Sequence, residues 1–268
     1  MTHASRRPPT YGDRYVDQVA VVTGASAGLG AQLCLDLARA GAIVIGLARN
    51  EERLDELRAK LQDASPPSQT VVCDVADTDA LRAALAAVVT AHGRIDILVN
   101  NAAQDPGIRL AEITEADFRR TLDVNFFAPV AATLSVLPSM LARGAGIIVN
   151  VSSDGGRLPG PGPGAYPSSK AALSAFSEST SFRLRPRGVR IYVVYPAFMP
   201  TALGVGALQR GLRKPPRLMV RSVKSVSRTI LAGIGGSSLE ISASKLIDAA
   251  MVFRFLMPRL FARGRKYW

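Results

Sequence analysis

The chain has 268 residues, of which 48% are hydrophobic, so it can bury a sizeable core as one large domain. It contains two cysteines and no run of ~20 uncharged apolar residues, which argues against a disulfide-stabilised scaffold and against a chain that spans a bilayer. The formal net charge of +12 is unevenly placed, because residues 201–268 hold 13 basic and 2 acidic residues.

The N-terminal residues 1–17 contain adjacent arginines but no apolar run of the length that an export signal needs. We therefore expect a mobile N-terminal arm there. The two cysteines, Cys34 and Cys73, lie in apolar patterns typical of packing residues, which is compatible with a reducing compartment. A cytoplasmic protein is expected.

Short apolar runs alternate with helical patterns from Gln18 onward. Strands followed by helices, with nearly continuous apolar strands, predict a parallel sheet covered on both faces. We expect a doubly wound, three-layer α/β/α domain of the Rossmann type over residues 18–268. The predicted strands are 18–24, 42–49, 69–75, 94–103, 144–153 and 189–198, and the predicted helices are 29–41, 50–64, 77–93, 114–141 and 165–188.

The pattern weakens after Pro200. Residues 201–219 show no clear period, 220–234 are typical of a helix, and 238–242 indicate an edge strand. An apolar and basic helix follows from Lys245, interrupted at Pro258.

The first predicted strand is followed by the sequence TGASAGLG, in which Gly24, Gly28 and Gly30 open the next helix. Glycines at these positions permit a tight turn and the close approach of a pyrophosphate, and the helix N-terminus supplies free N–H groups. Because the motif follows the first strand of a repeated β-α pattern, it predicts a dinucleotide-binding turn.

The end of the second predicted strand indicates which dinucleotide is bound. An acidic residue there accepts hydrogen bonds from a free ribose 2′-hydroxyl, whereas an arginine suits a 2′-phosphate. Ala48 stands where the acid is expected and Arg49 follows it, so the sequence favours NADP(H) over NAD(H). The alternative is that Arg49 is only a surface charge beside the next helix.

Tyr166 and Lys170 are four residues apart at the start of the predicted helix 165–188, so they share one face of it. Ser153 ends the preceding strand, and Asn125 lies in the long helix before that. The spacing alone leaves open a surface tyrosine beside a solvated lysine. All four residues together, behind a dinucleotide-binding turn, favour a catalytic group.

Seven motifs in the same order closely resemble those of the short-chain dehydrogenase/reductase family, specifically its compact single-domain branch. They are TGASAGLG, CDV, NNAA, Asn125, VSS, YPSSK and PAFMPT. The resemblance extends from about Gln18 to Thr201. It implies an oxidoreductase that interconverts a small-molecule carbonyl and an alcohol by hydride transfer, and a homodimer or homotetramer.

The resemblance assigns catalytic roles to four residues. Tyr166 is expected to exchange a proton with the substrate oxygen, and Ser153 to hold that oxygen. Lys170 is expected to bind the nicotinamide ribose and to lower the pKa of Tyr166, while Asn125 positions a water in the proton path to Lys170. Because an unperturbed tyrosine has a pKa of about 10, acid/base work near neutral pH asks for a shift of roughly three units.

The resemblance also assigns the cofactor-binding residues and implies no metal. Asp74 and Val75 are expected beside the adenine, Asn101 along the cofactor, and Thr201 at the carboxamide. The complete predicted set is Gly24, Ser26, Gly28, Leu29, Gly30, Arg49, Asp74, Val75, Asn101, Ala102, Tyr166, Lys170, Pro196, Phe198 and Thr201.

Three residues distinguish this chain from the usual family pattern. Ala103 and Ala197 stand where glycines are usual, and each adds a methyl group close to the expected cofactor. Asp154 follows the predicted catalytic serine, where it either contacts an amine or hydroxyl of the substrate or points to solvent.

The substrate is expected among the segments beyond the carboxyl ends of the strands, at 103–108, 154–164 and about 198–220. Apolar side chains there suggest an apolar ketone or secondary alcohol, and basic ones suggest an anionic substrate. The apolar set is Leu158, Phe198, Met199 and Leu203, and the basic set is Arg210, Arg213, Lys214 and Arg217.

Two other functions fit the same fold. One is a non-catalytic nucleotide-binding protein with a regulatory or scaffold role, against which the intact Ser153, Tyr166 and Lys170 argue. The other is an epimerase or dehydratase that uses a transient hydride transfer, against which the short spacing of Gly24 and Gly28 argues.

The C-terminal segment 245–268 alternates basic and large apolar residues. We expect it to cover the core or to pack against another subunit, with peripheral contact to a membrane surface as the alternative. Nucleic-acid binding is not expected, because no recognition motif accompanies the charge.

Overall fold

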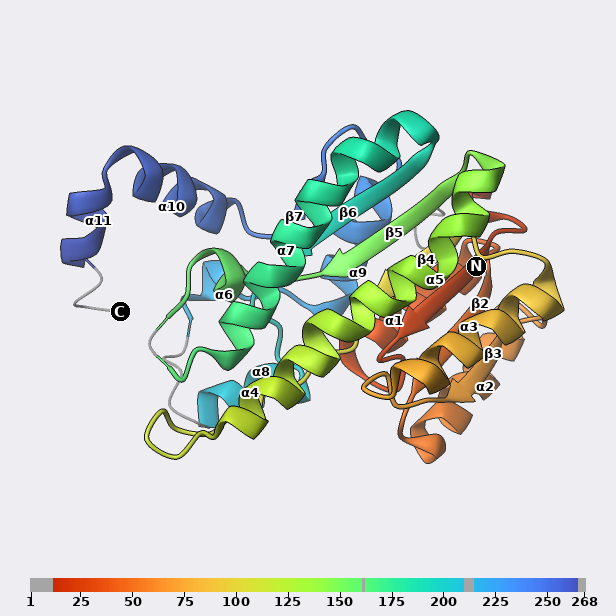
Figure 1. The fold of residues 1–268 in the computed structure, drawn as a ribbon, viewed down its shortest axis with the longest axis horizontal. Helices are drawn as coiled ribbons and strands as arrows, with labels where there is room; N and C mark the ends of the chain where they lie inside the picture. Colours follow the sequence, from red (N-terminus) through yellow and green to blue (C-terminus); the bar gives the residue numbers. More distant parts are fainter. Residues whose placement is uncertain (1–11, 161, 210–214, 265–268) are drawn as a thin grey trace, which may run out of the picture.

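The computed structural model describes residues 12–160, 162–209 and 215–264, which build a seven-stranded parallel sheet between two layers of helices (Figure 1). The strand order is β3-β2-β1-β4-β5-β6-β7, which confirms the predicted doubly wound sheet of a Rossmann-type domain. The strands are β1 (Val19–Thr23), β2 (Ile43–Ala48), β3 (Gln69–Val72), β4 (Ile97–Asn100), β5 (Gly146–Val151), β6 (Val189–Tyr195) and β7 (Glu240–Ser242).

Helices connect each strand to the next. They are α1 (Gly28–Arg39), α2 (Glu51–Ala64), α3 (Thr78–His92), α4 (Glu115–Leu122), α5 (Ala128–Arg143), α6 (Asp154–Arg157), α7 (Ala165–Leu184), α8 (Ala202–Gln209), α9 (Val223–Gly233), α10 (Lys245–Leu256) and α11 (Pro258–Gly264). The order of the strands reverses between β1 and β4, and in such sheets the crevice for a ligand lies at this point, beyond the carboxyl ends of the strands.

Alternate residues of each strand supply the two layers, because successive side chains of a strand point to opposite faces. In β1, Ala20 and Val22 pack in the cluster that contains α1, α2 and α9. Val19 and Val21 pack on the opposite face with α3 and α5. Both faces of the central strands are therefore buried, which explains why the sequence shows them as continuous apolar runs.

The long helix predicted at 114–141 is interrupted. It consists of α4, a π-helical turn η2 (Asp123–Phe127) and α5, and it ends two residues later than predicted, at Arg143. The backbone N–H of Ala128 reaches the carbonyl of Asp123 across this turn. Such π turns leave no clear sequence signal and often mark functional sites.

The helical run Glu115–Arg143 is also long and apolar enough, by length and composition, to cross a membrane. Half of its most apolar window is buried inside the protein, where Ala132, Val136 and Met140 pack against the sheet. A core helix of a water-soluble domain passes the same test, so this run is weak support for a membrane span.

The predicted arm 1–17 begins to pack on the domain earlier than expected. Gly12–Tyr15 form a single 3₁₀ turn, and the buried Tyr15 donates a hydrogen bond of 2.8 Å from its hydroxyl to the carbonyl of Leu231 in α9. Residues 12–15 are therefore part of the packed domain, and the rest of the predicted arm before them, residues 1–11, lies outside the described part of the chain.

The chain after β5 contains two helices that the periodicity misses. The short helices α6 and α8 lie in glycine-rich stretches, where glycine disfavours a helical prediction. The edge strand β7 and the interruption at Pro258 between α10 and α11 are as predicted. In Figure 1, α10 and α11 extend from the sheet and its helices instead of covering the core.

Candidate active site

The turn between β1 and α1 is shaped for the close approach of a ligand to the backbone. Gly24 has a φ of 66°, in the left-handed region that favours glycine. A Cβ on Gly24 would lie 2.8 Å from the Cα of Ala102, and one on Gly30 would collide with the carbonyl oxygen of Gly24. A side chain at either position would fill this cradle, so the residues present fit the pyrophosphate of a dinucleotide.

The first turn of α1 carries no side-chain cap. Ala27, at the N-cap, has no side chain that can accept the free backbone N–H groups, which are therefore left for an anionic ligand. Ser26 lies in the same turn and is partly exposed. Leu29 buries its side chain in the core, so it can offer a ligand only its backbone.

Arg49 and Asp74 meet beyond the carboxyl ends of β2 and β3. The guanidinium Nη1 of Arg49 lies 3.6 Å from the carboxylate Oδ2 of Asp74, and the side chains are 60% and 42% exposed. Exposed pairs of this kind contribute little to stability. A phosphate, which accepts two hydrogen bonds from one guanidinium, can therefore replace this partner at little cost.

Thr23, which the sequence analysis missed, joins β1 to the segment after β4. Its hydroxyl accepts hydrogen bonds from the backbone N–H groups of Asn101 and Ala102, each of 3.0 Å. The side-chain amide of Asn101 donates a bond of 2.9 Å to the carbonyl of Thr23. Asn101 thus holds the start of the glycine turn through its side-chain amide. Its contact with the cofactor stays a prediction.

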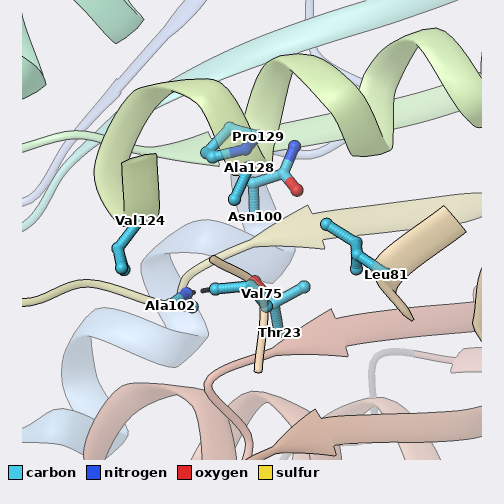
Figure 2. Close-up of a pocket in the computed structure, with 8 residues that line it drawn as sticks. All are labelled: Thr23, Val75, Leu81, Asn100, Ala102, Val124, Ala128 and Pro129. Atoms are coloured by element: carbon cyan, nitrogen blue, oxygen red, sulfur yellow. Dashed lines mark hydrogen bonds between the residues drawn. The ribbon is translucent and has the colours of Figure 1, made fainter. Parts of the chain in front are cut away.

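A hollow of about 170 Å³, including the space open to solvent, lies between this junction and the start of α5 (Figure 2). Two residues of the predicted cofactor set, Val75 and Ala102, line it, and neither Tyr166 nor Lys170 does. Its lining residues are Thr23, Val75, Leu81, Asn100, Ala102, Val124, Ala128 and Pro129. All of these residues except Ala102 are buried, so the hollow is a gap within the packed core, and the place of the adenine beside Val75 stays a prediction.

Thr201 approaches the glycine turn from the opposite side. A Cβ on Gly28 would lie 3.2 Å from the Cγ2 of Thr201. The Thr201 hydroxyl accepts a hydrogen bond of 3.3 Å from the backbone N–H of Gly204 in α8. Pro196 and Phe198 lie between the end of β6 and Thr201. The predicted residues of the β1 and β6 segments are therefore neighbours.

Helix α7 is held against β5 by buried polar side chains. Asn150 donates a hydrogen bond of 2.8 Å to the Oγ of Ser177 and accepts one of 2.8 Å from Asn100. Ser152 donates one of 2.9 Å to the carbonyl of Lys170. We call these five residues the polar seam. Buried polar groups pair only in one register, so the seam fixes the position of the first turn of α7.

Tyr166 lies in that first turn, with its hydroxyl among protein atoms. Burial raises the pKa of Tyr166 to about 12, while a hydrogen bond from the Ser153 side chain opposes the rise and the charges of Asp105 and Asp154 add to it. The Nζ of Lys170 is 5.9 Å from the centre of the Tyr166 ring. The predicted lowering of the tyrosine pKa by Lys170 is therefore wrong for the protein alone, because desolvation of the phenolate dominates.

Lys170 is almost fully buried. Its ammonium donates a hydrogen bond of 2.8 Å to the carbonyl of Val151, at the end of β5. Burial lowers the pKa of Lys170 to about 7. A surface position, the alternative that its spacing from Tyr166 left open, is excluded. A buried amine that titrates near neutral pH is suited to proton exchange.

Asn125 stands in the π-helical turn η2 and is fully buried. Its Oδ1 accepts a hydrogen bond of 2.8 Å from the backbone N–H of Gln104, and its Nδ2 donates to the carbonyl of Gln104 (2.8 Å) and to the Oγ of Ser169 (3.0 Å). Asn125 thus ties the segment after β4 to α7. The positioning of a water toward Lys170 stays a prediction.

The charge of Asp154 acts on Tyr166 and contributes to the raised pKa of that residue. Burial raises the pKa of Asp154 to about 7, with Arg157 lowering it and Asp248 raising it. Its Oδ1 is buried and has no hydrogen-bond partner among the described residues. This favours contact with a polar group of the substrate over the alternative that the carboxylate points to solvent.

The predicted substrate segments are only partly described. Leu158 is buried, Met199 packs against the core, and Leu203 and Arg217 are exposed. Three of the four basic candidates, Arg210, Arg213 and Lys214, lie outside the described residues.

Comparison with known proteins identifies a family whose model, described as short chain dehydrogenase, matches residues 18–209. The dehydrogenase/reductase SDR family member 7B of Rattus norvegicus is 33% identical over 258 residues, which cover 91% of this chain and 79% of the rat protein.

Solved structures agree in fold and differ in their cofactor. A metagenomic short-chain oxidoreductase in complex with NADP is 30% identical, with a TM-score of 0.70 and coverage of 86% of this chain and 97% of the other. A short chain dehydrogenase/reductase from Burkholderia phymatum in complex with NAD is 24% identical, with a TM-score of 0.81 and coverage of 92% and 95%. A nicotinamide dinucleotide is therefore expected, without a preference between its two forms.

Replacement Gly30→Ala is expected to lower stability by about 1–3 kcal/mol, because its methyl group collides with the carbonyl of Gly24 and forces the turn to shift. Cofactor binding should weaken in parallel. Thermal unfolding and cofactor fluorescence measure the two effects. Gly160→Ala is the control, since a Cβ there has no atom within 4 Å. Equal unfolding temperatures for both variants would contradict the tight turn.

Replacement Lys170→Met is expected to raise the unfolding temperature at pH 7 by ~2–4 °C. The folded protein holds the pKa of Lys170 near 7 instead of 10.5. Between pH 7 and 10.5 the Lys170 amine is therefore protonated more in the unfolded chain than in the folded protein. Lys170 thus lowers the stability of the wild type increasingly as the pH falls from about 10 to 7. The gain should shrink toward pH 10 and be absent in the exposed-site control Lys60→Met. A lower unfolding temperature of Lys170→Met than of the wild type at pH 7 would show that burial of the Lys170 ammonium does not destabilise the protein.

Proposed function

Because the chain belongs to the short-chain dehydrogenase/reductase family, we propose that it uses NADP(H) and that Tyr166 exchanges the proton with its substrate. It is an oxidoreductase that acts on carbonyl and alcohol groups with a nicotinamide cofactor. The proposal adds the preferred cofactor and the role of each residue to this assignment.

One observation carries the proposal. Tyr166 lies beside Ser153 and one helical turn from the buried Lys170, at the same edge of the sheet as the glycine turn. The glycine turn fits the pyrophosphate of a dinucleotide, and Thr201 lies against it. A proton donor and a dinucleotide site on one edge are what a carbonyl reductase needs.

Tyr166 acts as the acid in carbonyl reduction. When bound, the nicotinamide supplies a hydride to the carbonyl carbon or accepts one from the alcohol. Because burial raises its pKa to about 12, the phenol of Tyr166 keeps its proton at neutral pH and can donate it to the oxygen on which negative charge develops. Ser153 donates a second hydrogen bond to that oxygen.

Lys170 restores the proton of Tyr166. A buried amine with a pKa near 7 is present in both protonation states at neutral pH, so it can give up a proton and regain it. It would also hold the hydroxyls of the nicotinamide ribose. Asn125 keeps Ser169, the neighbour of Lys170, in place, and so positions the path by which the proton returns.

The preference for NADP(H) rests on Arg49. Its guanidinium is exposed at the end of β2, its partner Asp74 is bound weakly, and the place of an acid is taken by Ala48. A ribose 2′-phosphate would form charge-assisted hydrogen bonds with Arg49. The free ribose 2′-hydroxyl of NAD(H) would lack the carboxylate acceptor that an acidic residue at the position of Ala48 supplies.

We also propose that the protein forms a homodimer or homotetramer. Large apolar side chains are exposed on α5 and α7, among them Leu134 (58%) and Phe182 (73%). Exposed apolar residues on two adjacent helices are a typical interface between copies of one chain.

Replacement Tyr166→Phe is expected to lower the rate of ketone reduction at least ~10³-fold, because the phenyl ring has no proton to donate. Cofactor binding should change little. A screen of ketones graded in size and charge supplies the substrate, and cofactor oxidation supplies the rate. Tyr192→Phe is the control, since Tyr192 bonds the backbone at Gly235 and Gly236, outside the site. Full turnover by Tyr166→Phe would remove the proposed acid.

The protein is expected to bind NADPH at least ~10-fold more tightly than NADH, measured by cofactor fluorescence. Arg49→Ala should remove most of this difference by weakening NADPH binding alone, since it removes a charge-assisted contact to the 2′-phosphate. Arg82→Ala, which removes an exposed arginine that pairs with Asp79, is the control. Equal affinities in the wild type would refute the preference.

A further inference from the structure

The helices α10 and α11 form an extension with an uncovered apolar surface. In Figure 1 they extend away from the sheet, beyond α6. Phe253 and Phe261 make an edge-to-face contact of 6.3 Å between ring centres, which joins the two helices. Seven large apolar side chains are exposed, Phe255 to 85% of its area and Leu256 to 66%. They are Leu246, Val252, Phe253, Phe255, Leu256, Met257 and Leu260.

The face of α10 that contacts the domain is distinct from this surface. Ile247 is buried, and Arg254, two helical turns later, donates a hydrogen bond of 2.8 Å to the carbonyl of Arg157. At 100° per residue, Val252 and Leu256 project from the opposite side of the helix. The outer face of α10 is therefore apolar except for the exposed Lys245 at its first residue, and Arg254 lies on the inner face.

The extension is strongly basic. Residues 245–264 contain four basic residues and one acidic residue, Asp248. Asp248 is paired with Arg157 of α6 at 2.9 Å, so its negative charge is balanced by the domain and does not offset the positive charge of the extension. Arg259 and Arg263 are exposed on α11, next to the apolar surface. Exposed aromatic and aliphatic side chains flanked by arginines are typical of helices that lie in the interface of an anionic bilayer.

We propose that α10 and α11 dock this protein on an anionic lipid surface, with the outer face of α10 and Leu260 in the interface and the arginines of α11 on the headgroups. A second copy of the extension carries the same excess of positive charge and repels it. A lipid surface offers both an apolar layer and negative charge. The inference is independent of the proposed catalytic roles.

The attachment of α10 places the active site near such a surface. Arg157 ends α6, which begins directly after Ser153, and it pairs with Asp248 of α10. The extension thus starts beside the substrate segments. Docking would bring the carboxyl edge of the sheet to the lipid, where apolar ketones and alcohols accumulate.

The test uses the full-length protein and vesicles of phosphatidylcholine with or without about a third of phosphatidylserine. We expect co-sedimentation with the anionic vesicles, weakened at least ~10-fold by high salt. The triple variant Val252→Ser, Phe255→Ser and Leu256→Ser, and the pair Arg259→Glu and Arg263→Glu, should each lower binding at least ~10-fold.

Matched controls alter exposed residues elsewhere. Val16→Ser with Val72→Ser removes exposed apolar side chains, and Arg183→Glu with Arg187→Glu reverses exposed charges outside the extension. These controls should bind vesicles as the wild type does. Circular dichroism and the rate with a soluble ketone check that each variant is folded.

Three results would overturn the proposal. The first is the absence of wild-type binding to anionic vesicles, and the second is equal binding to neutral and anionic vesicles. The third is a loss of oligomer mass in the triple variant with unchanged vesicle binding, which would assign the apolar face to a second copy of the chain. Mass photometry measures the oligomer in all variants.

Discussion

The polar seam between α7 and β5 is the constraint on which the candidate site depends. An apolar helix face can slide or rotate by small amounts, whereas Asn150 bonds Ser177, and Ser152 bonds the carbonyl of Lys170, in one arrangement only. This arrangement sets Tyr166 beside Ser153 and directs Lys170 toward the end of β5. The seam thus fixes the positions of Tyr166 and Lys170 on α7 relative to the end of β5.

Burial then determines the electrostatics of the site. It disfavours both the phenolate of Tyr166 and the ammonium of Lys170, so the two residues expected to share a proton are each shifted toward their neutral form. The protein alone does not hold a tyrosinate ready. Instead it holds a proton donor next to an amine that can exchange its proton, at a cost in stability that is common for functional groups kept in a low-dielectric setting.

Much of this arrangement could be predicted from the sequence. Continuous apolar strands gave the parallel sheet, and Gly24, Gly28 and Gly30 gave the turn, because both depend on local patterns. The π-helical turn at Asn125 could not be predicted, since it replaces one hydrogen-bond register with another inside an ordinary helical pattern. The direction of the Tyr166 pKa also depends on burial, which no spacing of residues reveals. Thr23 was missed although a polar residue that ends a buried strand is a usable signal.

Arg157 has a consequence for how the chain can change over time. Its guanidinium lies 3.9 Å over the ring of Tyr195 and pairs with Glu240 and Asp248, so one side chain joins α6, β6, β7 and α10. With the attachment concentrated there, the outer residues of α10 face almost no packing constraint. Substitutions on that face can accumulate without disturbing the glycine turn or the polar seam. The surface that the extension contacts can therefore change during evolution while the chemistry of the site is kept.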